Sequence, residues 1–327
     1  MRPTTRTSTS RFVTHSTRRR ARWHTTSTAS ATWRGNRDAA VAAIANRGRA
    51  MKCIVAATDF TPASDIAVRQ AAALARRAGA RLVVVHAANI EGAKPDLFER
   101  ITGRADAFRQ DVRAELAARK KQLENVRDGV GGAEAGIECR MVDGFPDEAI
   151  ARAAVDFDAG LVVVGTRRGE GPILLGSVSE RVLRASPRPV LVARAPVAEA
   201  GFARILAAVD FEPASERAVE MALAVAADGA TVDLLHARGD ADDPDPRGEQ
   251  WVERFGGRGA TVRYHSHRGH PSQQILDHID RERYDLVALG SHGHRGWRRW
   301  WLGSLAEATV RYAPCSALVA PPESASV

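Results

Sequence analysis

Short apolar runs alternate with longer amphipathic stretches over residues 51–320 of the chain. Each run is continuous and rich in β-branched residues, which is typical of parallel strands covered on both faces of a sheet. In the first half the expected strands are CIVAAT, RLVVVHA, IECRMV, GLVVVG and PVLVA, at residues 53–58, 81–87, 137–142, 160–165 and 189–193. This alternation of strands and helices predicts an α/β fold built on a doubly wound open sheet.

Helical patterns fill the segments between these strands. One runs from Pro62 to a stop at Gly79, because proline favours the first helical position and glycine the position after the last. A second, long and highly charged, covers residues 96–128, and a third begins at Pro146 with an acidic first turn. In the second half the segment ADDPDPRGEQWVERFGG belongs to a connection about 25 residues shorter than its counterpart, so it has room only for a short helix.

The chain consists of one unit written twice. The sequence TDFTPASDIAV from Thr58 matches VDFEPASERAV from Val209. Four further pairs follow in the same order: LVVVHA and VDLLHA, DGFPDEAI and RGHPSQQI, AGLVVVGT and YDLVALGS, and LGSVSERVLRASPRPVLVA and LGSLAEATVRYAPCSALVA. The repeat predicts two tandem domains of five parallel strands each, at residues 51–195 and 203–321, joined by a linker around 194–204.

The first fifty residues differ from the rest in composition. They hold eleven arginines, ten threonines, five serines and one acidic residue, Asp38, and they show almost no apolar periodicity. Such a segment buries too little surface to offset its ordering entropy, so we expect it to be disordered. Three interpretations stay open: a transit peptide, a nucleic-acid-binding arm, or untranslated sequence upstream of a start at Met51. We favour the third, because Met51 stands directly before the first expected strand.

The net charge of +8 comes from this extension. Residues 1–50 carry +10, whereas the other 277 residues hold 36 basic and 38 acidic side chains, a net charge of −2. This distribution argues against nucleic-acid binding by the folded part. The sequence has no run of 18 apolar residues, so no membrane span is expected. Cys53, Cys139 and Cys315 lie far apart in or beside apolar runs, which indicates neither disulfides nor a zinc site and favours a reducing cytoplasm.

Candidate ligand contacts lie where the expected strands end. In an open α/β sheet, ligands bind beyond the carboxyl ends of the strands, at the point where the strand order reverses. Asp59 and Asp210 follow the first strand of each half, where a carboxylate can accept hydrogen bonds from a ribose hydroxyl or a base amine. Capping of the following helix explains them equally well. Ala87 and Ala237 end the second strands, where small side chains leave backbone groups free to meet a base.

A glycine-containing loop, GSHGHRGWRRWWLGS, follows the fourth strand of the second half at residues 290–304. Gly290 and Gly293 permit backbone conformations closed to other residues and a close approach of the main chain to an anion. Gly303 and Ser304 then open the last helix, whose free N–H groups and dipole favour a phosphate. Three glycines alone also fit a plain turn, but their position within a repeated α/β unit favours phosphate binding.

With these residues the chain resembles a tandem universal stress protein over roughly residues 51–320. Nucleotide-binding members of that family carry G-x2-G-x9-G-[S/T] after the fourth strand, and Gly290, Gly293, Gly303 and Ser304 match it in full. The resemblance implies an adenine nucleotide alpha hydrolase-like, Rossmann-like fold that holds ATP, with or without Mg²⁺, at the switch point of the sheet.

The same resemblance implies particular contacts and pairings. The phosphates would lie on the loop glycines and Ser304, and the adenosine near Asp210 and the backbone of Ala237. The fifth strands would pair between the domains, so that one chain imitates the dimer that is usual in the family. Association of two such chains into a homodimer stays open.

The first half matches this pattern only in part. Asp59, Ala87, Gly165, Gly176 and Ser177 fall on corresponding positions. In GTRRGEGPILLGS, however, an arginine replaces the second glycine of the motif and the loop is two residues shorter. A neighbouring glycine or the loop arginines could substitute, and the family also contains members that lack the loop and do not bind ATP. We therefore expect the second domain to bind nucleotide and the first to be an altered copy.

Histidines and tryptophans offer weaker signals. HRGH at 267–270 imitates the H-x-G-H signature of nucleotidyl-transferring enzymes, but it precedes the third helix instead of following the first strand, so catalysis is not expected. His265 and His267 would share one strand face, yet no carboxylate or cysteine lies at ligand spacing, which favours a solvent-facing strand end over a metal site. For His292 and His294 the backbone is expected to matter more than the rings. WRRWW at 297–301 fits a surface that stacks on a base or a partner protein, or an amphipathic turn over the loop, with single-stranded nucleic acid as a third option.

The motifs together favour a binding protein over an enzyme. No nucleophile–base constellation, Walker loop or acidic pair with magnesium spacing occurs in the sequence, so turnover is not expected. The expected function is that of a cytoplasmic, two-domain, ATP-binding stress-response protein that acts by binding and signalling, with a protein partner that the sequence does not identify. Two rivals stay open: a nucleotide-free interaction module, and a slow ATPase or nucleotidyl transferase.

Overall fold

The computed structural model describes residues 51–88, 105–132, 136–166, 177–195, 200–239, 243–291 and 302–322. The Arg-rich extension, the loop segments with Gly176 and Gly293, and the WRRWW stretch lie outside the described residues. The expected disorder of the extension therefore stays a prediction.

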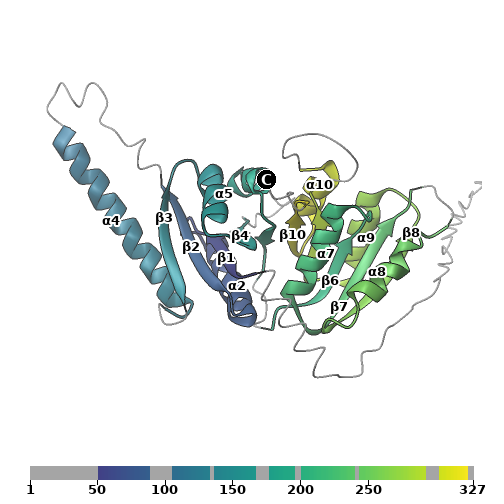
Figure 1. The fold of residues 1–327 in the computed structure, drawn as a ribbon. Helices are drawn as coiled ribbons and strands as arrows, with labels where there is room; N and C mark the ends of the chain where they lie inside the picture. The colour runs from purple at the N-terminus through teal and green to yellow at the C-terminus, as the bar shows by residue number, and fades with distance from the viewer. Residues whose placement is uncertain are drawn as a thin grey trace, which may run out of the picture.

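The strands of both halves form one sheet (Figure 1). In the first half they are β1 (Cys53–Ala57), β2 (Arg81–Ala88), β3 (Ile137–Asp143), β4 (Leu161–Gly165) and β5 (Val190–Ala193). In the second half they are β6 (Phe202–Ala208), β7 (Ala226–Ala237), β8 (Ala260–His267), β9 (Leu286–Gly290) and β10 (Ser316–Ala320). The order is β3-β2-β1-β4-β5-β10-β9-β6-β7-β8, and neighbours within each half are parallel. The predicted doubly wound α/β fold is confirmed in each half, with the order reversing between the first and fourth strands.

Helices cover both faces of the sheet. The described helices of one face are α2 (Pro62–Ala78), α4 (Ala105–Gly129), α7 (Pro213–Val225) and α8 (Arg247–Phe255). Those of the other face are α5 (Pro146–Asp156), α6 (Ser177–Ala185), α9 (Pro271–Glu282) and α10 (Ser304–Tyr312). In β1, Ile54 and Ala56 pack in the first layer and Cys53 and Val55 in the second, and all four are buried. Burial on both faces explains why this strand is a continuous apolar run.

The two halves meet at their fifth strands. β5 and β10 pair in antiparallel fashion, with Leu191 opposite Leu318. Above this junction, Arg184 of α6 donates a hydrogen bond of 2.8 Å to Glu307 of α10. The pairing that the family resemblance implied is therefore present, and the two repeats share one continuous sheet instead of forming two separate ones.

Helix ends follow the local sequence in the first half more closely than in the second. α2 begins at Pro62 behind the cap residue Thr61 and stops at Gly79, whose φ of 62° is the left-handed conformation that glycine favours. α4 is described from Ala105, so the expected start at residue 96 lies outside the described part. α7 has 13 residues against 17 in α2, because Ala226 already pairs with Phe202 of β6. No helix in the described ranges is long and apolar enough to cross a membrane.

Candidate functional site

Each half of the sheet has a cavity at the carboxyl ends of its strands. The first cavity, of about 270 Å³, is lined among others by Asp59, Ser64, His86, Ala87, Gly165 and Ser177. The second cavity, of about 380 Å³, is lined among others by Asp210, Ser215, His236, Ala237, Gly290 and Ser304. Both lie at the reversal of strand order, since they are bounded by the ends of the first and fourth strands.

The cavities collect the described residues that the sequence predicted as ligand contacts. Those of the second half that line the second cavity are Asp210, Ala237, Gly290, Gly303 and Ser304. Those of the first half that line the first cavity are Asp59, Ala87, Gly165 and Ser177. The remaining two predicted residues, Gly176 and Gly293, lie outside the described residues. Segments far apart in the sequence thus converge at one place in each half.

The two cavity aspartates are held differently. Asp59 Oδ1 accepts hydrogen bonds from the Thr61 N–H at 3.1 Å and from the Thr61 hydroxyl at 2.5 Å. Burial raises the pKa of Asp59, but the hydrogen bonds that it accepts, those from Thr61 first and that from Ser64 next, together outweigh burial, so the net pKa lies below its usual value. Asp210 Oδ1 accepts from the Glu212 N–H at 3.1 Å, and glutamate offers no hydroxyl there. The carboxylate of Asp210 is therefore less occupied by its own turn than that of Asp59.

A phenylalanine with positive φ follows each of these aspartates. Phe60 and Phe211 both have a φ of 64°, a conformation that is strained for a bulky side chain. Packing of the aromatic rings offsets this strain. The ring centroids of Phe60 and His86 are 4.4 Å apart, and the ring centroid of Phe211 lies 4.9 Å from that of His236 and 5.1 Å from that of Trp251. This tight turn sets each aspartate at the mouth of its cavity.

The first glycine of each loop is required for space. Gly165 and Gly290 do not have a positive φ. A Cβ at Gly290 would lie 2.8 Å from the carbonyl carbon and Cβ of Ala214, and one at Gly165 would lie 2.4 Å from the carbonyl oxygen of Ala63. Neither glycine therefore uses the positive φ that glycine permits, and the space available explains both residues. These glycines let the fourth strand approach the amino end of α7 or α2.

The last helix of the second half presents its amino end to the second cavity. Gly303 caps α10 in an extended conformation and donates its N–H to the Ser291 carbonyl at 2.8 Å. The first intrahelical bond runs from the Glu307 N–H to the Gly303 carbonyl at 2.9 Å. The N–H groups of the intervening turn have no partner within the helix, and the exposed hydroxyl of Ser304 lies beside them. Such a helix start attracts anions.

The comparisons with known proteins agree with this architecture. The chain matches the model of the universal stress protein family over residues 51–194, 201–256 and 247–321. It belongs to the universal stress protein family. A universal stress protein of Thermus aquaticus is 35% identical over 150 residues, which cover 98% of that protein and 44% of this chain. Nearly a whole relative thus matches less than half of this chain, as expected for a unit present twice.

Two further relatives extend over more of the chain. A universal stress protein of Mycolicibacterium smegmatis is 31% identical over 198 residues, which cover 54% of this chain and 67% of that protein. The crystal structure of a universal stress protein from Archaeoglobus fulgidus superimposes with a TM-score of 0.62 and 22% identity, and the match covers 83% of this chain and 99% of that one. The latter comparison shows the fold that the two chains share.

Two cavity histidines of this universal stress protein escaped the sequence reasoning. His86 donates from Nδ1 to the Thr58 carbonyl at 2.9 Å, and its Nε2 accepts from Arg119 of α4 at 3.0 Å. Burial lowers the pKa of His86, and it also lowers the pKa of His236. The shared H-A at the end of LVVVHA and VDLLHA was the available signal, because a residue beside a switch-point position faces the same edge of the sheet.

The connection between β7 and β8, which is shorter than its counterpart in the first half, contributes a positively charged side chain to the second cavity. Arg247, the first residue of α8, lines that cavity and lies 4.7 Å above the centroid of Phe211. Asp245 holds it, with the Arg247 Nη2 atom 2.7 Å from a carboxylate oxygen. The segment that carries Arg247 is not among the sequence pairs that match between the two halves. Sequence comparison of the halves therefore could not reveal this residue.

Proposed function

We propose that this universal stress protein binds an adenine nucleotide, ATP with or without Mg²⁺, in the second cavity. We further propose that it acts by binding and signalling in the stress response, without turnover. The observation that carries the proposal is the convergence of Asp210, Ala237 and the Gly303-Ser304 helix start around one cavity. Its volume of about 380 Å³ lies in the range of small-molecule sites.

The residues that line the second cavity offer the hydrogen-bond donors, acceptors and positive charge that such a ligand requires. The start of α10 and the Ser304 hydroxyl supply donors for phosphate oxygens. Asp210 can accept from ribose hydroxyls or the base amine, and the backbone at Ala237 can meet the base edge. Arg247 adds a positive charge that attracts phosphate, and the negative charge of its partner Asp245 partly neutralises that charge. Bound ATP would supply a charged, adenosine-specific effector, and the chain's own groups would bind and orient it.

The proposal assigns one nucleotide to each chain. The first cavity is smaller, about 270 Å³ against about 380 Å³, and the Thr61 side chain already engages Asp59. Arg119 engages His86, which lines the first cavity, and the glycine loop of the first half is the altered copy of the motif in sequence. These differences favour weaker nucleotide binding in the first half.

Further parts of the proposal concern organisation. We propose two domains, at residues 51–195 and 203–321, that pair with each other within one chain. Their ligand would be an adenine nucleotide, and neither a nucleic acid nor a membrane would be a partner. A homodimer of such chains remains one arrangement that the proposal allows. A cytoplasmic location is included, and the three cysteines, all free thiols, fit it.

Calorimetric titration of the full chain with ATP tests the proposal. Asp210→Asn is expected to weaken binding at least tenfold, because it removes a charged acceptor from the second cavity. The same substitution at the matching position of the first cavity, Asp59→Asn, is expected to leave the main binding event in place. No heat with the wild-type chain would favour a nucleotide-free interaction module, and phosphate release above that of Asp210→Asn would favour a slow ATPase.

A further inference from the structure

A cluster of polar side chains lies within the second half, away from the two cavities. Asp233 of β7 is only 1% exposed, and its neighbours Val232 and Leu234 are 0% exposed. On the same face of the sheet, β8 contributes His265 and the helix α9 contributes His278. None of the three lines the second cavity. The sequence reasoning dismissed His265 as a solvent-facing strand end without a nearby carboxylate, and the structure corrects this, because β7 brings one.

The repeat shows that the fold does not need this cluster. In the first half the position of Asp233 is held by Val83, which is fully buried and pairs with β3 in the same register. His278 of α9 corresponds to Ala153 of α5, and Tyr284 corresponds to Ala159. The positions of Asp233, His278 and Tyr284 are therefore apolar in the first half, whereas the position of His265 is held by Arg140. A buried carboxylate is costly unless it is paired or holds a metal ion, and Val83 shows that an apolar residue fits this place in the fold.

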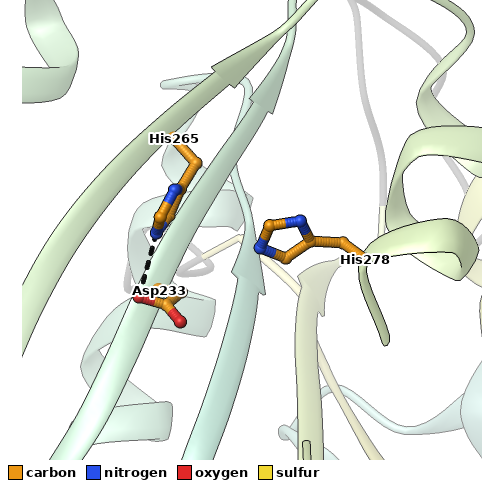
Figure 2. Close-up of side chains that lie close together, drawn as sticks. All are labelled: Asp233, His265 and His278. Atoms are coloured by element: carbon orange, nitrogen blue, oxygen red, sulfur yellow. Dashed lines mark hydrogen bonds and ion pairs between the residues drawn. The ribbon is translucent and has the colours of Figure 1, made fainter. Parts of the chain in front are cut away.

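The three groups converge on a common point (Figure 2). His265 Nε2 lies 3.1 Å from Asp233 Oδ1, and the ligand atoms of all three residues lie within 4.8 Å of one another. Tetrahedral zinc with bonds of about 2.0–2.1 Å places its ligands roughly 3.3 Å apart. The Asp233–His265 separation is close to that spacing, and metal binding would draw the ligand atom of His278, now within 4.8 Å of the other two, closer to them.

His278 has a ring nitrogen, Nε2, that is available to coordinate a metal ion. Its Nε2 atom is buried and has no hydrogen-bond partner among the described residues. Burial, followed by the neighbouring His265 and His267, lowers the pKa of His278 to about 4, so the imidazole is neutral near pH 7. A buried imidazole nitrogen without a partner is unusual, and a neutral one is a ready metal ligand.

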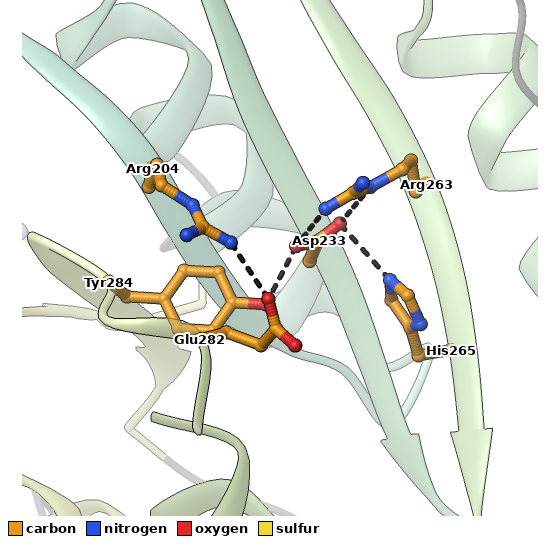
Figure 3. A network of polar contacts seen from close by, with 6 residues as sticks. All are labelled: Arg204, Asp233, Arg263, His265, Glu282 and Tyr284. Atoms are coloured by element: carbon orange, nitrogen blue, oxygen red, sulfur yellow. Dashed lines mark hydrogen bonds and ion pairs between the residues drawn. The ribbon is translucent and has the colours of Figure 1, made fainter. Parts of the chain in front are cut away.

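Neighbouring donors hold the carboxylate in place (Figure 3). Arg263 binds both oxygens of Asp233, at 2.6 and 2.7 Å, and the Tyr284 hydroxyl donates to Oδ2 at 2.6 Å. A carboxylate has about four acceptor positions, and these three bonds leave one of them on Oδ1. The His265 Nε2 atom now occupies that position, so a metal ion that binds there would replace this hydrogen bond and bridge the two residues. Donors of this kind orient a ligating carboxylate and are typical of metal sites.

We propose that Asp233, His265 and His278 bind one divalent transition-metal ion, Zn²⁺ by the nature of the ligand set, and thereby fasten α9 to β7 and β8. Two imidazole nitrogens and one carboxylate oxygen match zinc more closely than magnesium or calcium, which prefer oxygen ligands. Water completes the coordination. The site is independent of the nucleotide proposal.

The test uses the full chain without a histidine tag, freed of metal by chelator dialysis. Titration with ZnCl₂ by calorimetry is expected to give one strong site per chain, and CoCl₂ is expected to produce visible absorption bands of low-coordinate cobalt. His278→Gln and His265→Gln each lower the affinity at least tenfold and abolish the cobalt bands. His270→Gln is the matched control, since His270 is exposed, lies in the same HRGH stretch and contacts Ser272 instead of the cluster.

Both ligand variants keep a polar side chain of similar reach, so folding is expected to survive, and circular dichroism without metal checks it. Wild-type zinc affinity in a folded His278→Gln chain would overturn the proposal, as would the absence of zinc binding by the wild-type chain. If His278→Gln does not fold, His265→Gln, at a side chain 25% exposed, decides on the same criteria.

Discussion

The close approach of β9 to α7 predicts that Gly290→Ala destabilises the protein. The added Cβ would lie 2.8 Å from two carbon atoms of Ala214 and 2.9 Å from the backbone nitrogen of Ser215. Carbon atoms at ordinary contact are roughly 3.5–4.0 Å apart, so about 1 Å must be recovered by backbone movement. β9 is hydrogen-bonded between β6 and β10, which leaves it little room to yield. Overpacking of this kind costs about 1–3 kcal/mol.

Urea and thermal unfolding measure the cost. At about 2 kcal/mol, Tm is expected to fall by roughly 4–8 °C for a chain of this size. Gly129→Ala is the matched control, because Gly129 ends α4, has nothing within 4 Å of an added Cβ and does not have a positive φ. That variant is expected to be neutral or to gain up to about 1 kcal/mol from helix propensity. Equal stability of Gly290→Ala and the wild-type protein would refute the steric account of this glycine.

Three further predictions concern other parts of the fold. Burial lowers the pKa of His86, so below about pH 6.5 the unfolded chain binds more protons than the folded one. The free energy of unfolding is therefore expected to fall from pH 7.5 to pH 5. In His86→Gln the urea midpoint is expected to change less over this pH range than in the wild-type protein. Glu307→Gln weakens the 2.8 Å contact with Arg184 between the halves and is expected to cost up to about 1 kcal/mol, an effect that shrinks in 1 M salt. Tyr284→Phe removes the 2.6 Å hydrogen bond to buried Asp233 and is expected to cost about 1.5–3 kcal/mol in urea unfolding; an unchanged midpoint would contradict the charged state of that carboxylate.

Most of the fold follows from periodicity in the sequence. The expected strand CIVAAT differs from β1 by one residue, and the start and stop of α2 at Pro62 and Gly79 are those of the sequence. These elements depend on local signals: continuous apolar runs for buried parallel strands, and proline and glycine at helix ends. Periodicity alone does not predict that the two halves share a single sheet, because the pairing of β5 with β10 joins segments more than a hundred residues apart.

The parts of the site that the sequence missed depend on spatial neighbours. The sequence suggested backbone freedom and a close approach to an anion for Gly290, and only the structure shows that Ala214 occupies the space a side chain would need. Asp233 and His278 carried no local motif, since the parallel register and the α9 crossover bring them together. A position-by-position comparison of the halves would have marked Asp233, because Val83 occupies the matching place.

The unequal cavities lead to a direct count of ligands. Native mass spectrometry of the full chain, titrated with ATP, reports how many nucleotides each chain holds. We expect one ATP per wild-type chain, one per Asp59→Asn chain and none per Asp210→Asn chain at the same concentration. Two nucleotides per wild-type chain, or one that persists in Asp210→Asn and disappears in Asp59→Asn, would contradict the assignment of a single nucleotide to the second cavity.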